Sequence, residues 1–535
     1  MSGALKAASN ATLGFLGLNT QEAGITLESG YATKALNCII DKYGRLGSRR
    51  GWTKLTTTPD GLNSSYVESL FEFIDIDRTS TILSAGNGKL FNGSITLTNL
   101  PVYGAESGGT ATPLSTQPTF TGNRWQFAQL AEGAGYGAAM YGFAVQGAND
   151  ALVYRRMNHT GSYIFQKIGA YGAKPTGVST FDPDCVLSAF GRIWMAGVTG
   201  AKSTIYFSKL LDGANFTGTG SGLIDVASVV GNNDEIVALG SHNGFLIVFC
   251  RNNVVIYKDP QDPTATTFSL QDVITGVGCV GRDTVQNTGT DLIFLSKSGL
   301  RSLNRVINEK SAPMRDLSSN IRDDLITFMA GENLNNVKSV YYERDAFYLL
   351  SFPLLKQIIY FDLRQQLPNG AARAAYWTDI TPKAFLAASD RTLYLGISGG
   401  VGSYTGYTDN GSNYRLEYLT QNTDFGSPYT LKFLKKAKVV VIASGVQDII
   451  LKYGFDYHSS FSSRVFVKDF ATGTSEYNIA EYNIGEYSSG MNISEMDLNL
   501  GGSGKILQFG VEATIDGTPI SLQQLTVYIK QGKMI

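Results

Sequence analysis

Cysteine and histidine are scarce in this chain, which has four of the first and three of the second in 535 residues. The cysteines are scattered singly through apolar stretches, with no CxxC pair. This pattern favours buried free thiols, in a protein folded in a reducing compartment, over a disulfide pair. No two histidines have metal-ligand spacing, so we expect no zinc site. The residues concerned are Cys38, Cys185, Cys250, Cys279, His159, His242 and His458.

Charge is also sparse. Charged residues make up 17% of the chain and the net charge is −1, so nothing general points to nucleic acid or to an anionic membrane as a partner. No window approaches the roughly 18 continuous apolar residues of a membrane span, so we expect none. The first twenty residues carry one lysine and no sustained apolar stretch, so we expect no signal peptide.

Glycine and apolar residues, by contrast, are plentiful. There are 60 glycines, and the hydrophobic fraction of 43% is ample for a core. Low charge together with many Gly, Tyr and Phe is typical of an all-β protein with many turns. The same composition also suits a chain that buries much of its outside against partner subunits.

A repeating unit runs through residues 184–303. Short apolar strands there alternate with turns at residues 190–192, 242–244 and 287–289, and each unit contains three or four strands. Blades of a β-propeller repeat in this way at roughly 40 to 50 residues. Similar units flank this region on both sides. The predicted fold class is therefore all-β: a β-propeller of about six or seven blades, with an N-terminal arm and a C-terminal antiparallel β-sheet or sandwich domain.

The sequence predicts three parts. Residues 1–60 form an N-terminal arm and short hairpins, residues 61–408 the propeller, and residues 409–535 the C-terminal β domain. Within the propeller, residues 104–122 are a Gly/Ser/Thr/Pro-rich loop insertion without periodicity. Residues 316–330 are predicted to be helical, with Asp316 as the N-cap. The apolar stripe of that helix consists of Leu317, Ile321, Leu325 and Phe328.

The N-terminal region contains several short motifs in a fixed order. It reads GLNT…LESGYATKALNCIIDKYGRLGSRRGW, ending at Trp52. A Gly-Leu-Asn segment precedes a small-residue stretch that ends in Asn37. An Asp-x-x-Gly turn at residues 41–44 and an Arg-x-Gly ending at residues 49–51 follow. This order resembles the opening of the tail proteins of short-tailed bacteriophages called nozzle, tail tubular protein B or tail hub proteins.

Two later regions resemble the same family. In the middle of the chain a helix is followed by a Tyr-rich hairpin, a strand ending in Tyr360-Phe361-Asp362, and then Trp377. The stretch AFGRIWMAG…STIYFSK…NF, residues 189–216, also fits. Near the C-terminus, Phe425-Gly426-Ser427 precedes a lysine-bearing strand.

The resemblance implies a structural role in the virion. The chain would form a ring with itself, a hexamer, around the DNA channel below the portal adaptor, and take part in genome retention and ejection. The implied partners are tail adaptor proteins, tail fibres or spikes, and passing DNA that is not bound sequence-specifically. The implied location is the virion tail, after assembly in the host bacterial cytoplasm. The alternative is a β-propeller that binds glycans or a receptor.

Two glycine-rich stretches partly match nucleotide-binding motifs. Gly276, Gly278 and Gly281 match G-x-G-x-x-G, but a strand follows where a dinucleotide fold needs a helix. We interpret them as bends between blades. The stretch GGSGK at residues 501–505 lacks the first glycine of a phosphate loop, and Ile506 stands where that loop needs Ser or Thr. A hairpin turn is the better interpretation.

The remaining candidates are charged. Asp75 and Asp77 alternate on a predicted strand and would face one side, as paired carboxylates for glycoside hydrolysis would, but an exposed strand face accounts for them better. Two basic clusters suit solvated faces or subunit contacts better than DNA binding. Their members are Arg45, Arg49 and Arg50, and Lys432, Lys435, Lys436 and Lys438. The sequence thus predicts no enzyme, no cofactor, and no catalytic, cofactor-binding or metal-binding residue.

Overall fold

A computed structural model of the chain describes residues 6–10, 15–41, 44–107, 110–122, 124–132, 139–157, 161–231, 234–264, 267–309, 316–458, 460–469 and 492–534. The chain is mostly β, with 52% of its residues in strands and 7% in helices. The predicted all-β class is thereby confirmed. Among the described residues, no helix has the length and apolar character needed to cross a membrane.

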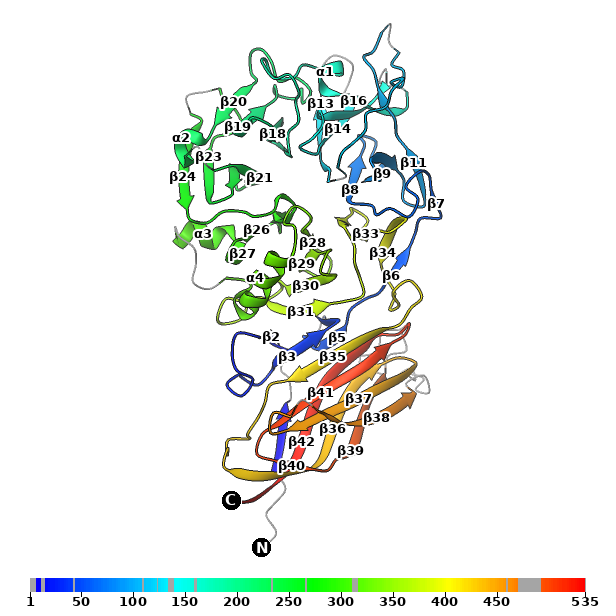
Figure 1. Ribbon diagram of the computed structural model, residues 1–535, viewed down its shortest axis with the longest axis vertical. Helices are drawn as coiled ribbons and strands as arrows, with labels where there is room; N and C mark the ends of the chain where they lie inside the picture. The colour runs from blue at the N-terminus through cyan, green and yellow to red at the C-terminus, as the bar shows by residue number, and fades with distance from the viewer. Residues whose placement is uncertain are drawn as a thin grey trace.

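Most strands belong to a ring of small sheets (Figure 1), which are antiparallel except for the β7–β11 and β12–β16 pairs. Six separate sheets and one end of a ten-stranded sheet follow one another around this ring, which gives it a β-propeller-like architecture. The ring sheets contain, in order within each sheet, β7 (Thr58–Pro59), β11 (Thr96–Asn99), β10 (Lys89–Asn92), β9 (Ser80–Gly86) and β8 (Ser69–Ile74); β12 (Val102–Tyr103), β16 (Tyr163–Lys167), β15 (Leu152–Arg156), β14 (Ala139–Val145) and β13 (Gln126–Glu132); β17 (Cys185–Ala189), β18 (Arg192–Val198), β19 (Ala201–Phe207) and β20 (Gly222–Asp225); β21 (Ile236–His242), β22 (Phe245–Cys250), β23 (Asn253–Lys258) and β24 (Ser269–Thr275); β25 (Gln286–Asn287), β26 (Leu292–Ser296) and β27 (Gly299–Ser302); β28 (Lys338–Tyr342), β29 (Phe347–Phe352), β30 (Gln357–Asp362) and β31 (Arg373–Trp377); and β32 (Ala384–Ala387), β33 (Leu393–Ile397), β34 (Gly400–Tyr404) and β6 (Trp52–Lys54).

Tight turns set the register of these sheets. Ala189 pairs with Arg192 across the two residues Phe190 and Gly191, which have φ angles of 56° and 69°. Two positive φ angles define the type I′ turn, whose twist matches that of the flanking strands. The β21–β22 hairpin has the same geometry at residues 243 and 244. The predicted hairpins at these two places are confirmed.

The ring is closed by a strand from the N-terminal region. β6 pairs antiparallel with β34, joining Trp52 to Tyr404 and Lys54 to Gly402. The last sheet of the ring is therefore completed by residues that precede the first sheet. Opening the ring at this point would cost the hydrogen bonds of a whole strand pair.

Two further sheets form the C-terminal part of the molecule. The first is seven-stranded, in the order β39-β36-β42-β5-β4, with β1 on β42 and β40 on β36. The second continues the ten-stranded sheet from β31 through β3, β35, β41 and β37 to β38, with β2 on β3. The buried side chains of both sheets belong to one core. Their strands are β1 (Lys6–Asn10), β2 (Gly17–Leu18), β3 (Tyr31–Leu36), β4 (Cys38–Ile40), β5 (Leu46–Ser48), β35 (Tyr414–Thr420), β36 (Thr430–Ala443), β37 (Val446–Phe455), β38 (Ser462–Asp469), β39 (Asn492–Asn499), β40 (Ser503–Gly504), β41 (Leu507–Ile515) and β42 (Ile520–Met534).

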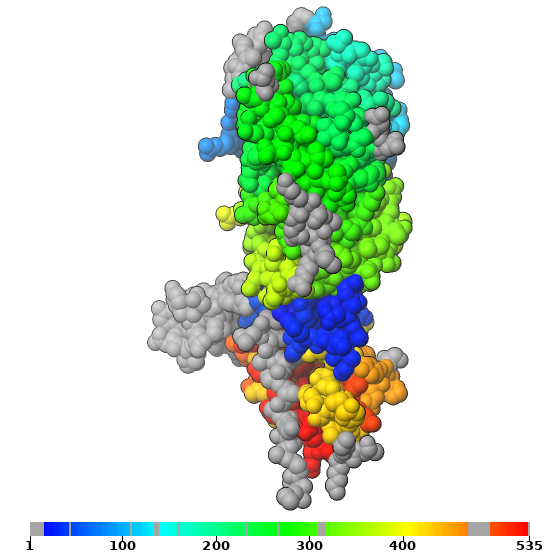
Figure 2. All heavy atoms as spheres, turned by 90° about the vertical axis from the view of Figure 1, so that its left-hand side faces the viewer, coloured from blue at the N-terminus to red at the C-terminus, as the bar shows by residue number. Residues whose placement is uncertain are grey.

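The N-terminal segment, residues 15–54, connects these parts. β3 pairs with β31 of the ring through Leu36 and Tyr376, and with β35 of the C-terminal part on its other side. β4 and β5 pair with each other across the Asp41 turn, as predicted, and β5 also pairs with β42. Figure 2 shows this segment, in blue, between the ring above and the C-terminal strands below. The predicted division at residues 60 and 408 stays a prediction, but strand pairing crosses it repeatedly.

The helix predicted at 316–330 begins later than expected. A 3-10 turn, η3 (Ser319–Ile321), precedes α4 (Arg322–Gly331). Asp316 does not cap α4, because its carboxylate accepts hydrogen bonds from the backbone N–H and hydroxyl of Ser318, both at 2.9 Å, and pairs with Arg322 at 2.7 Å. The sequence also missed a second helix of moderate length. The remaining helices are α1 (Ile168–Tyr171), α2 (Ala227–Val230), η2 (Arg282–Thr284) and α3 (Leu303–Glu309).

Candidate functional site

A buried arginine lies where the ring meets the C-terminal part. The side chain of Arg49 is 0% exposed, and its two terminal nitrogens donate to the Asp409 carboxylate at 2.8 and 2.6 Å. Its Nε donates to Oδ1 of Asn37 at 2.9 Å, and further bonds reach the carbonyls of Arg50 and Thr378. The guanidinium is thus held by a bidentate ion pair and three further acceptors, so its burial is compensated.

Asn37 is the second member of this junction. Its φ of 55° is a left-handed conformation that asparagine tolerates better than most residues. Its amide nitrogen donates to the carbonyl of Arg415 at 2.8 Å, and its amide oxygen accepts from the backbone N–H of Thr378 at 2.9 Å. One asparagine side chain thereby joins the last strand of a ring sheet to the first strand of the C-terminal part.

Packing completes the junction. The Arg49 guanidinium lies over the Tyr414 ring, with Cζ 3.9 Å from the ring centroid. Gly51 lies so close to the neighbouring chain that a Cβ there would be 2.0 Å from the carbonyl oxygen of Thr408. The indole of Trp377 donates to the carbonyl of Cys38 at 3.0 Å and stacks between two tyrosines. The motif residues Asn37, Arg49 and Gly51 therefore have structural roles at one place.

A second charged cluster lies at one mouth of the ring. Charged residues lie at the start of the first strands of the ring sheets or up to three positions before them, and first strands of neighbouring sheets lie against one another. The charged residues therefore gather at one opening. They are Glu68, Arg124, Asp184, Asp234, Glu235, Asp283, Lys338 and Lys383.

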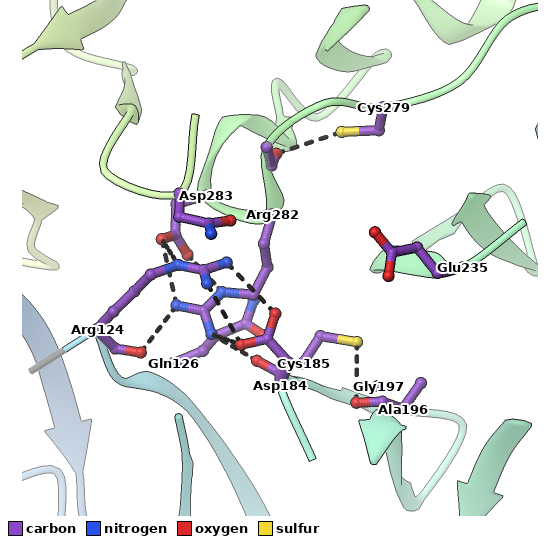
Figure 3. A network of polar contacts seen from close by, with 12 residues as sticks. Arg124, Gln126, Asp184, Cys185, Ala196, Gly197, Glu235, Cys279, Arg282 and Asp283 are labelled. Atoms are coloured by element: carbon purple, nitrogen blue, oxygen red, sulfur yellow. Dashed lines mark hydrogen bonds and ion pairs between the residues drawn. The ribbon is translucent and has the colours of Figure 1, made fainter. Parts of the chain in front are cut away.

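The centre of this cluster is a network of shared ion pairs (Figure 3). Arg282, whose side chain is fully buried, pairs with Asp283 at 2.8 Å and with Asp184 at 3.2 Å. Lys338 donates to Asp283 at 2.6 Å. Arg124 reaches both carboxylates, but only at 3.4 Å. Three cations thus share two carboxylates.

The pKa values follow from this crowding. Burial alone would raise the pKa of Asp283, but Arg282 and Lys338 hold it well below its usual range. Burial and the neighbouring Arg282 lower the pKa of Arg124. Burial is also the main cause of the lowered pKa of Lys338. Three cations therefore compete for two carboxylates, so positive charge is in excess at this point of the ring.

The paired carboxylates considered for catalysis are placed differently from the prediction. β8 ends at Ile74, so Asp75 and Asp77 lie in the turn after it and do not alternate on a strand. One guanidinium nitrogen of Arg156 lies 2.5 Å from Asp75 and 3.7 Å from Asp77. Hydrogen bonds from Thr79 lower the pKa of Asp77. Both carboxylates are thus organised around the same guanidinium, that of Arg156.

The histidines and cysteines of the described residues form no metal-binding group. His242 was predicted to lie in a surface turn, but it is buried as the last residue of β21, because its side chain faces the sheet interior. His458 is exposed, and His159 lies outside the described residues. All four cysteines are buried free thiols, as predicted, and burial raises the pKa of Cys185 to about 12. No group of three metal-ligating side chains occurs within the part of the chain that the structure describes.

The two glycine motifs are structural. Gly276 to Gly281 connect β24 to the short turn η2, and a Cβ at Gly278 would lie 2.2 Å from the carbonyl oxygen of Arg251. Their interpretation as bends between sheets is confirmed. Gly502 and Gly504 pack against the ring of Phe455. They have no phosphate-loop geometry, since β40 pairs with β36 at this point.

Internal contacts use most of both basic clusters. Arg45 pairs with Asp41, and Arg49 lies in the junction. Lys432 is buried and donates to two backbone carbonyls. Lys436 pairs with Asp497 at 2.8 Å, and Lys438 pairs with Glu495. The prediction of solvated faces or subunit contacts was wrong for Arg49 and Lys432, because both side chains are buried on partners within the chain, of which Asp409 and Lys505 are remote in sequence.

Comparisons with known proteins give only the fold. No family model matches the chain. No curated protein matches it either. Among solved structures, the WD40 domain of Neurospora crassa Pan2 is similar at 11% identity and a TM-score of 0.35, covering 67% of this chain and 96% of that one.

Two bacterial structures are similar at the same level. PorZ of Porphyromonas gingivalis, a surface component of the type-IX secretion system, has 11% identity and a TM-score of 0.35, covering 69% of this chain and 42% of PorZ. The extracellular domain of a hybrid two-component system protein of B. thetaiotaomicron has 10% identity and a TM-score of 0.30, covering 72% and 66%. At these values the similarities carry no argument about function.

The buried ion pair of the junction predicts a large effect of one substitution. Arg49→Met leaves the Asp409 carboxylate buried without its partner, so the free energy of unfolding should fall by about 3–5 kcal/mol. Urea denaturation measures this loss. The double variant Arg49→Met/Asp409→Asn should recover part of it, because neither charge is then buried alone. Arg464→Met, on exposed β38, is the matched control, and an equal loss in that variant would contradict the assigned role of Arg49.

A buried carboxylate predicts a pH dependence. Glu132 ends β13 and accepts a hydrogen bond from the backbone N–H of Gly213 at 2.7 Å. Burial raises the pKa of Glu132 from 4.5 to about 7. The folded state therefore holds a proton that the unfolded state releases between these values. Stability from Glu132 is complete below about pH 4.5 and is lost as pH rises through 7.

The substitution Glu132→Gln removes this titration. Relative to the unsubstituted chain, the variant should gain about 2–3 kcal/mol of unfolding free energy between acidic and mildly alkaline pH. Urea denaturation at a series of pH values measures the difference. Glu343→Gln, at an exposed position, should leave the pH profile unchanged. Parallel profiles for Glu132→Gln and the unsubstituted chain would refute the assignment.

Proposed function

We propose that this chain is a structural subunit of the tail nozzle, or tail hub, of a short-tailed bacteriophage. Copies of it form a hexameric ring around the DNA channel below the portal adaptor, and the ring takes part in genome retention and ejection. The observation that carries the proposal concerns residues 15–54. The segment whose sequence resembles the opening of that family is the same segment that joins the ring to both C-terminal sheets.

The roles of the motif residues support this proposal. Asn37, Arg49 and Gly51 meet in the junction, and few other residue types could replace them there. Asn37 has a positive φ angle, Arg49 donates from its whole guanidinium group, and Gly51 leaves no room for a Cβ. A ring that serves as a conduit is best built from rigid subunits. A buried bidentate pair and continuous sheet hydrogen bonding are suited to that task.

Exposed strand edges on the C-terminal part offer a route to assembly. Among the described residues, β38 pairs only with β37, and β39 only with β36. Val465 and Val467 on β38 are more than 60% exposed, as is Val446 on β37. Exposed apolar edge strands are costly in a free monomer and are common where a neighbouring chain adds a strand or docks. Neighbouring copies, adaptor proteins, and fibres or spikes are the expected partners.

One observation favours the second candidate, a glycan-binding propeller. A cavity of about 570 Å³ lies between the sheet of β8–β11 and the sheet of β32–β34. Hydroxyl groups, two carboxylates and one tyrosine line it, a mixture that suits a sugar. The polar lining includes Glu72, Ser80, Thr96, Ser389, Asp390 and Tyr394. A glycan array with the purified chain distinguishes this candidate from a purely structural role.

Electron microscopy of virus particles from the source, labelled with an antibody against this chain, tests the proposal. Label is expected at the distal part of a short tail, because a nozzle lies below the adaptor ring. An antibody against the capsid serves as the positional control. The proposal fails if tailed particles carry no label while the same antibody recognises the isolated chain.

A further inference from the structure

A pocket opens at the charged mouth of the ring. Its volume is about 510 Å³. The first residue of β28 and residues before β8, β13 and β32 line it. The turn between β29 and β30 completes the lining. The polar and charged lining residues are Glu68, Arg124, Asn335, Asn336, Lys338, Lys356 and Lys383. Four different sheets thus contribute side chains to one pocket.

The charges of the lining are unequal. Four cationic side chains face a single carboxylate, Glu68. Glu68 is already engaged by Lys383 at 3.2 Å. Lys356, exposed in the β29–β30 turn, has no ion-pair or hydrogen-bond partner for its ammonium group among the described residues. The pocket therefore presents a concentration of positive charge that its own lining does not neutralise.

The two carboxylates of the neighbouring ion-pair network, Asp184 and Asp283, do not neutralise the positive charge of the pocket. Arg124 and Lys338 line the pocket and also take part in the ion-pair network, in which Lys338 shares Asp283 with Arg282 and Arg124 shares both carboxylates with Arg282. Both contacts of Arg124 are long, at 3.4 Å. Burial lowers the pKa of Arg124 and of Lys338, and Arg282 lowers both further. An anion in the pocket would relieve this repulsion.

We infer that the pocket at the ring mouth binds a phosphate-sized oxyanion. Ammonium and guanidinium groups donate charge-assisted hydrogen bonds to phosphate oxygens, and they converge here from several sides, as a tetrahedral anion requires. The exposed amides of Asn335 and Asn336 add neutral donors. The volume leaves room for a small organic group attached to the phosphate. This site does not depend on the proposed role in a phage tail.

Calorimetric titration of the full chain with inorganic phosphate, against sodium chloride at equal ionic strength, tests the inference. Saturable binding is expected. Lys356→Gln should weaken it about ten-fold, because one charge-assisted contact is lost. Lys258→Gln is the matched control, since Lys258 is equally an exposed ring lysine without a partner among the described residues. It should leave the affinity unchanged.

Two results would overturn the inference. One is the absence of saturable heat with the unsubstituted chain, and the other is equal weakening in the two lysine variants. Circular dichroism of both variants verifies that the fold is retained. Competition with glycerol 3-phosphate then separates the two sources of the anion. Displacement of phosphate indicates that the site accepts phosphate monoesters, and no displacement indicates the free ion; either result upholds the oxyanion site.

Discussion

The arrangement of this molecule depends on the buried ion pair between Arg49 and Asp409. A fully buried guanidinium is tolerated only when every donor has an acceptor, and the acceptors here come from the N-terminal segment, the end of the ring and the start of the C-terminal part. Arg49 therefore joins the N-terminal segment to two regions that lie 329 and 360 residues further along the chain. The neutral amide of Asn37 also joins these regions, since it donates to the carbonyl of Arg415 and accepts from the backbone N–H of Thr378. The junction therefore has two polar side chains at its centre.

In the ring, too, charged side chains from separate parts of the chain share ion pairs. Residues placed before the first strands meet at one mouth, where Arg282 and Asp283 anchor a network that links several sheets. Closure by β6 means that this network is built on a continuous circle of sheets. The junction ties that circle to the C-terminal sheets, whose exposed strand edges face outward. The proposed assembly into a larger ring requires a rigid subunit with strand edges that can contact a neighbouring copy.

Local features of this fold were predictable from the sequence, and remote pairings were not. The turns at Gly191 and Gly244 and the strands around them follow from dipeptide preferences and alternation, which act over a few residues. Arg49 looked like a member of a surface cluster, since its partner lies 360 residues away. Lys432 was misplaced too, since one of the carbonyls that it reaches, that of Lys505, lies 73 residues away. The charged mouth is visible in the sequence as charged residues that recur near the starts of the first strands. The sequence alone does not show that these residues meet, because they come together only when the ring closes.

The central claim is that the N-terminal segment is an integral strand between the ring and the C-terminal part. Hydrogen exchange of the β3 backbone amides, residues 31–36, measures this most directly. The account predicts that β3 exchanges as slowly as β31 and β35, the strands on its two sides, because all three open together. Rapid exchange of β3 while both neighbours remain protected would contradict the account, since the segment would then be a peripheral arm.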